Sequence, residues 1–130
     1  MVDFSAFVPE DGLPIYLQII RYVKRAVAAG TAGDGDELPS RRVLSALLGV
    51  NPNTVQKAYK LLEDEGLISS RSGAKSEISL TPGRVEDIRR QLLEQEAGLL
   101  VRSLQQAGLE KTDAFALLDR LWEERKEESP

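Results

Sequence analysis

The chain of 130 residues contains no cysteine and no histidine. The absence of cysteine excludes disulfides and thiolate metal sites. The absence of histidine removes the commonest general base, the Ser-His catalytic pair and the usual zinc ligand. Apolar runs long enough to cross a bilayer are also missing, and no short apolar segment follows a basic N-terminus. We therefore expect a cytoplasmic binding protein that is not an enzyme and uses no metal or cofactor.

Acidic residues outnumber basic ones, 21 to 17, but the two kinds are unevenly distributed. Residues 1–13 carry three acids and no base, residues 14–80 carry nine bases and seven acids, and residues 81–130 carry eight bases and eleven acids. Within the middle block, residues 38–62 hold no acid and four bases, namely Arg41, Arg42, Lys57 and Lys60. A ligand that touches one face responds to the local field more than to the net charge, so this segment is compatible with nucleic acid.

Two helices are predicted in the first half of the middle block. Pro14 suits the first turn of a helix and Gly30 suits its end, with an apolar stripe between them formed by Tyr16, Ile19, Ile20, Val23 and Val27. A turn-rich loop follows. Ser40 is then a good N-cap for a short second helix that ends at Gly49, and its expected apolar side is formed by Val43, Leu44, Leu47 and Leu48.

A third helix is predicted after Asn51, which can cap it, with Pro52 in its first position. Its apolar residues at helical spacing are Val55, Ala58, Tyr59 and Leu62, and its opposite face carries Asn53, Thr54, Gln56, Lys57 and Lys60. After Gly66 the pattern becomes strand-like, and residues 67–80 predict a β-hairpin. Three helices with a tight turn between the last two, followed by a hairpin, are typical of a winged helix-turn-helix, whose third helix enters the major groove.

The outer face of the third helix suits DNA chemically. Small side chains let the helix end approach base edges, and asparagine and glutamine can read adenine with paired hydrogen bonds. Free N–H groups and the positive end of the helix dipole also suit a phosphate.

Two more helices are predicted after Thr81, one to about Ala107 and one capped by Thr112. We therefore expect a mainly α fold with a small β-hairpin: an N-terminal arm (1–13), a winged helix-turn-helix domain (14–80) and a two-helix C-terminal element (81–130). The apolar stripes of the last element are expected to form a dimer interface that includes Val85, Ile88, Leu92, Leu100, Leu104, Phe115, Leu118, Leu121 and Trp122.

Three segments, residues 38–42, 47–59 and 62–68, closely resemble the GntR family of bacterial transcription regulators. The Asn-Pro-Asn-Thr-Val-Gln sequence at 51–56 resembles its YtrA-like branch, and the resemblance extends from Pro14 to about Leu80. It implies a transcription regulator, a repressor in particular, that binds a palindromic operator on double-stranded DNA as a homodimer. About 50 residues follow Leu80, too few for an enclosed pocket of ordinary size. The sequence leaves open whether a small-molecule effector binds between the dimer halves or no effector exists.

The resemblance also implies DNA-binding roles for individual positions. Arg42 corresponds to the arginine that contacts DNA from the second helix, and Gly73 to the glycine at the tip of the wing. The expected DNA-binding residues are Arg41, Arg42, Asn51, Asn53, Thr54, Gln56, Lys57, Lys60, Arg71 and Gly73. The sequence departs from the family in the wing and at Val43, where an acid usually completes a capping box. The alternative function is a winged-helix module for protein–protein contact that does not bind DNA.

Overall fold

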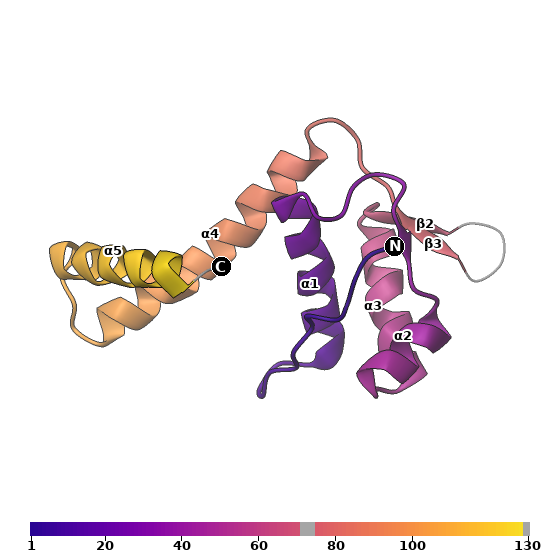
Figure 1. Cartoon of the computed structure of the whole chain (residues 1–130), viewed down its shortest axis with the longest axis horizontal. Helices are drawn as coiled ribbons and strands as arrows, with labels where there is room; N and C mark the ends of the chain where they lie inside the picture. Colours follow the sequence, from indigo (N-terminus) through magenta and orange to yellow (C-terminus); the bar gives the residue numbers. More distant parts are fainter. Residues whose placement is uncertain (71–74, 129–130) are drawn as a thin grey trace. The chain divides into compact units, whose positions relative to one another are not determined.

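Five helices and three short strands make up the part of the chain that this computed structural model describes, residues 1–70 and 75–128 (Figure 1). The expected mainly helical fold with a small β element is confirmed. The chain divides into two compact units, Met1–Leu92 and Leu93–Pro130.

The first three helices begin and end close to the residues that the sequence indicates. Helix α1 (Ile15–Ala29) follows Pro14 and ends at Gly30, whose φ of 81° is left-handed. Helix α2 (Arg41–Leu48) is capped by Ser40, whose hydroxyl accepts a hydrogen bond from the Val43 N–H at 3.2 Å. Helix α3 (Pro52–Asp64) follows the cap residue Asn51. These caps satisfy backbone groups that the helix itself leaves without partners.

The β element is a three-stranded antiparallel sheet in the order β1-β3-β2, in place of the expected two-stranded hairpin. Strands β2 (Ile68–Ser70) and β3 (Ser76–Ile78) form the hairpin. Strand β1 (Glu37–Leu38) pairs with the other side of β3, which is therefore the central strand. The sequence did not predict β1, because two residues are too few to show an alternating pattern.

The N-terminal arm packs against α1. Val2 and Phe4 are buried in the core, and the Phe4 ring stacks on Tyr22 with 4.9 Å between centroids. The side-chain amide of Gln18 donates to the carbonyl oxygens of Glu10 and Leu13 and accepts from the Glu10 N–H, at 2.7–2.9 Å. Gln18 therefore fixes the chain where the arm turns into α1.

Helix α4 (Arg84–Gln106) begins in the first unit and continues into the second. Ile88 belongs to the core of the first unit, and the Arg89 guanidinium donates to the Ala28 carbonyl oxygen at 2.8 and 3.2 Å. The packing division between the two units thus falls within α4, after Leu92.

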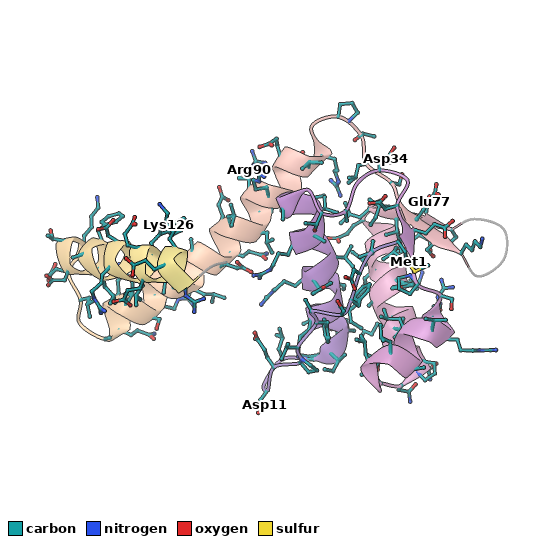
Figure 2. All side chains as sticks on the ribbon, viewed as in Figure 1. Met1, Asp11, Asp34, Glu77, Arg90 and Lys126 are labelled. Carbon is teal, nitrogen blue, oxygen red and sulfur yellow. The ribbon has the colours of Figure 1, made fainter. Side chains whose placement is uncertain are left out.

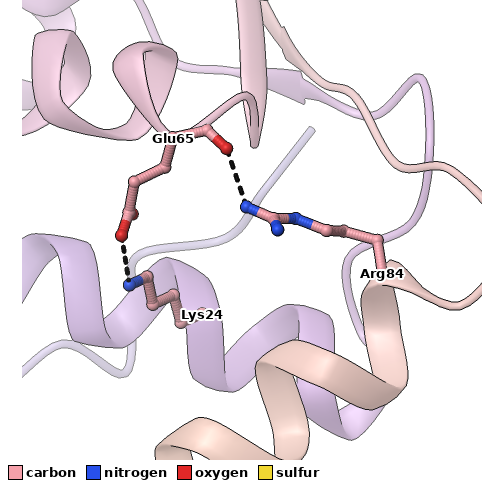
Figure 3. A network of polar contacts seen from close by, with 3 residues as sticks. All are labelled: Lys24, Glu65 and Arg84. Carbon is pink, nitrogen blue, oxygen red and sulfur yellow. Dashed lines mark hydrogen bonds and ion pairs between the residues drawn. The ribbon is translucent and has the colours of Figure 1, made fainter.

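The run of three acids at the end of α3 has a structural explanation. Glu65 accepts twice: its carboxylate pairs with the Lys24 ammonium at 3.1 Å, and its carbonyl oxygen accepts from Arg84 at 2.7 Å (Figure 3). Glu63 accepts from the Ser70 hydroxyl at 3.2 Å, and Asp64 lies 3.7 Å from the Lys60 ammonium. The acids therefore join α3 to α1, β2 and α4.

The second unit is a helical hairpin of the rest of α4 and α5 (Lys111–Glu128), with a turn at Gly108 (φ 86°). Helix α5 starts one residue before the expected cap, Thr112. No α5 side chain up to residue 127 is buried, and large apolar side chains such as Phe115 and Trp122 face solvent. None of the described helices combines the length and the apolar character that a membrane span requires.

Candidate nucleic-acid interface

The tight turn between α2 and α3 is held by Ser45. Its carbonyl oxygen accepts from the N–H groups of Gly49 and Val50, and its hydroxyl donates to the Val50 carbonyl oxygen at 2.6 Å. Gly49 has a φ of 68°, a left-handed conformation that glycine adopts without steric cost. This arrangement orients α3 relative to α2, which a helix-turn-helix requires.

Helix α3 has one buried face and one open face. Val55, Ala58, Tyr59 and Leu62 are buried in the core, whereas Asn53, Gln56, Lys57 and Lys60 are exposed and Thr54 is half-buried. The structure thus places the polar residues expected to contact DNA on the solvent side. No acid interrupts these residues in the sequence, because the nearest acids are Glu37 before α2 and Glu63 at the end of α3.

The backbone donors at the start of α3 are already used. The Asn53 N–H donates to the Asn51 side-chain oxygen at 2.8 Å, the Thr54 N–H donates to the Asn51 carbonyl oxygen at 2.9 Å, and Pro52 has no N–H. These two N–H groups are therefore engaged within the protein, and a phosphate contact at this helix end stays a prediction. Asn51 has a capping role in addition to its expected DNA contact.

The two arginines of α2 differ in their surroundings. Arg42 is exposed. The Arg41 guanidinium carbon lies 5.8 Å from the centre of the Tyr59 ring, and its Nε is buried with no hydrogen-bond partner among the described residues. The Tyr59 hydroxyl donates to the Pro39 carbonyl oxygen at 2.7 Å. Tyr59 is thus a core residue that supports the start of α2.

Tyr59→Phe is expected to lower the free energy of unfolding by about 1–2 kcal/mol at neutral pH, because it leaves the Pro39 carbonyl oxygen without its donor. Burial raises the pKa of the Tyr59 phenol above its usual range, and the Arg41 charge opposes this weakly. Above about pH 10 the unfolded chain therefore loses this proton before the folded protein does, and stability falls as pH rises. The variant should lose less stability over that alkaline range.

Urea unfolding at neutral pH and at about pH 11 measures both effects. Tyr22→Phe is a matched control, because the Tyr22 hydroxyl donates to the Asp3 carbonyl oxygen at the same 2.7 Å but at an exposed position. Equal alkaline losses in the wild type and Tyr59→Phe would contradict the prediction.

The two lysines of the open face have different partners. The Lys57 ammonium lies 4.0 Å from the centre of the Tyr16 ring on α1. The Lys60 ammonium lies 3.7 Å from the Asp64 carboxylate, one turn along α3. Lys57 thus keeps its full charge for an anionic ligand, whereas that of Lys60 is partly offset.

The expected wing contacts, Arg71 and Gly73, lie outside the described residues. Strands β2 and β3, which precede and follow them in the sequence, are described. Figure 2 labels Glu77 on β3 and Asp34 in the loop before β1. Asp34 accepts the Leu80 N–H at 2.8 Å, so it supports the sheet.

The residues expected at the dimer interface divide into two groups. Ile88 and Leu92 are buried, and Val85 packs against the core of the first unit, so these three already have partners within the protomer. In the second unit, Leu104 and Leu118 are half-buried, whereas Leu100, Phe115, Leu121 and Trp122 are exposed. The apolar surface open to a second copy therefore begins after Leu92.

Sequence reasoning misplaced two residues and missed two others. Val43 and Leu47, expected on the apolar side of α2, are 55% and 60% exposed, because this short helix buries only the row that contains Leu44. Ser45 has no role in the expectations from the sequence, although a serine inside an apolar row is a signal. The sequence places Tyr16 in the apolar stripe of α1, and no signal in it connects Tyr16 with Lys57.

Comparisons with known proteins agree with this geometry. Residues 15–78 match the model of the bacterial regulatory proteins of the gntR family. The chain is 37% identical to the HTH-type transcriptional repressor YtrA of Bacillus subtilis (strain 168) over 119 residues, which are 92% of this chain and 87% of YtrA. It is 30% identical to the HTH-type transcriptional regulator YhcF of the same strain over 104 residues, 80% of this chain and 86% of YhcF.

Among solved structures, a GntR family transcriptional regulator from Listeria monocytogenes aligns with a TM-score of 0.76 and 29% identity, covering 86% of this chain and 98% of that one. The helix-turn-helix, the family match and the similarity to YtrA over most of both chains agree with one another. The chain therefore belongs to the GntR family, in which it resembles the YtrA-like branch, and it is a DNA-binding transcription regulator.

Proposed function

We propose that the chain is a repressor that binds a palindromic operator as a homodimer in the cytoplasm. The observation that carries the proposal is the open face of α3, where Asn53, Gln56 and Lys57 are exposed on a helix anchored by a buried face. Amide side chains can read base edges in the major groove, and lysine neutralises a phosphate. The Bacillus subtilis relative YtrA is named as a repressor.

The second unit supports the homodimer. Residues of α4 and α5 line an apolar groove of about 810 Å³, among them Leu100, Val101, Leu104 and Phe115. Soluble proteins seldom leave such a continuous apolar surface open to water. A second copy covers it with the same surface, since twofold symmetric interfaces are self-complementary.

A twofold dimer presents two identical α3 helices and so requires two inverted half-sites. For helix-turn-helix dimers their centres lie about 34–36 Å apart, one turn of the duplex. A dimer bound across a promoter blocks other proteins from the same DNA, which is how it represses.

Selection of bound duplexes from a random pool, by the full chain, is the experiment that tests the proposal. We expect an inverted repeat with half-site centres about 10 base pairs apart, and an affinity that falls steeply as salt rises. Recovery of a single unrepeated site would contradict the homodimer. An enriched pool with no common sequence would contradict operator recognition.

A further inference from the structure

Lys57, on the open face of α3, lies against an aromatic ring of another helix. Its ammonium lies 4.0 Å from the centre of the Tyr16 ring. Tyr16 is the second residue of α1, and it is half-buried and packs against the core, so the ring itself is held in place. The contact joins two helices through residues that lie 41 positions apart in the sequence.

An aromatic ring and a carboxylate order a lysine in different ways. The ring attracts the ammonium through its quadrupole and leaves the charge of the lysine unchanged. A carboxylate offsets the charge. Lys24 lies 3.1 Å from the Glu65 carboxylate, and Lys60 lies 3.7 Å from that of Asp64. Lys57 is therefore both ordered and available to a phosphate.

A long, freely rotating lysine loses much conformational entropy when it binds. Where the side chain is already restricted in the free protein, less entropy is lost on contact with DNA, and affinity rises. The ring occupies one side of the ammonium, and the remaining N–H groups can donate to a phosphate oxygen.

We propose that Tyr16 is a positioning residue for DNA binding, whose ring holds the Lys57 ammonium ready for a phosphate contact. The proposal rests on DNA binding through α3. Under this proposal, α1 raises the affinity for DNA through Lys57, and α1 itself makes no contact with DNA. Since phosphate contacts carry no sequence information, Tyr16 should affect operator and random duplexes equally.

A double-mutant cycle in the full chain tests this, with Tyr16→Leu, Lys57→Ala and the pair together. We expect Tyr16→Leu to weaken binding to operator and random duplexes by about two- to fivefold, and to have no further effect once Lys57→Ala is present. Tyr16→Phe keeps the ring and should bind as the wild type does. Loss of affinity from Tyr16→Leu that persists unchanged beside Lys57→Ala would overturn the proposal, as would no loss at all.

A second measurement needs neither DNA nor a variant at Tyr16. Ring currents should shift the proton signals of the Lys57 side-chain methylenes upfield of those of Lys60 in the NMR spectrum of the wild-type chain. Coincident signals would overturn the proposal. If Lys57→Ala leaves affinity unchanged while the wild type still selects an inverted repeat, the inference fails and the proposed function stands.

Discussion

Leu100→Glu is expected to make the protein monomeric and to weaken operator binding by about two orders of magnitude. Leu100 is 43% exposed and lines the apolar groove of the second unit, so a carboxylate there would be buried without a partner when a second copy covers the groove. Without the dimer, the two half-sites are no longer bound as a linked pair, and the gain from linkage, about 10²- to 10⁴-fold, is lost.

Sedimentation velocity and fluorescence anisotropy with a labelled operator measure the two effects. Leu99→Glu is the matched control, because Leu99 is 58% exposed on the same helix and does not line the groove. A duplex with one half-site should bind the monomeric variant through a single α3 helix. A Leu100→Glu protein that still sediments as a dimer would show that the interface lies elsewhere.

Asn53→Ala combined with Gln56→Ala is expected to abolish the preference for the operator over random DNA. Each amide that reads a base edge contributes about 1–3 kcal/mol of discrimination, and a dimer contributes each twice. Helix α3 should still fold, because its first turn is capped by Asn51 and neither substituted side chain forms a hydrogen bond within the described residues. Binding to random duplexes should persist through the cations.

Competition between operator and random duplexes at fixed salt gives the specificity ratio directly. Gln91→Ala removes an exposed amide from α4 and should leave that ratio unchanged. Retained specificity in the double variant would assign base reading to other residues. Equal weakening on all duplexes would instead indicate that the two amides contact phosphates.

Helix ends were predictable from the sequence because their causes are local. Ser40 and Asn51 bond to N–H groups two or three residues further along, and Gly30 and Gly49 adopt left-handed conformations directly after their helices. Each signal lies within a few residues of the boundary that it sets.

Partners distant in the sequence could not be predicted in the same way. Strand β1 pairs with β3, which lies almost forty residues further along the chain. Ile88 and Leu100 are both expected on the apolar side of α4, yet Ile88 is buried in the first unit and Leu100 is exposed in the second. Periodicity identifies an apolar face but does not identify what covers it, which is also why Val43 and Leu47 were misplaced.

The candidate DNA-binding residues followed from their pattern on one helix, but their partners did not. Arg41 lies against Tyr59 because of how α2 packs on α3. Lys57 lies against Tyr16 because of how α1 packs on α3. A sequence shows which face of α3 is polar, and only packing shows which of its cations are ordered.

The chain contains a single tryptophan, Trp122, which is 71% exposed on α5. An indole emits at longer wavelength in water than in an apolar environment, so covering this side chain would shift its emission to the blue. Because no other residue of the chain contributes tryptophan fluorescence, the intrinsic emission of the unlabelled protein is a spectroscopic probe of α5 alone. A dilution series would then follow dissociation of the proposed dimer without an attached dye.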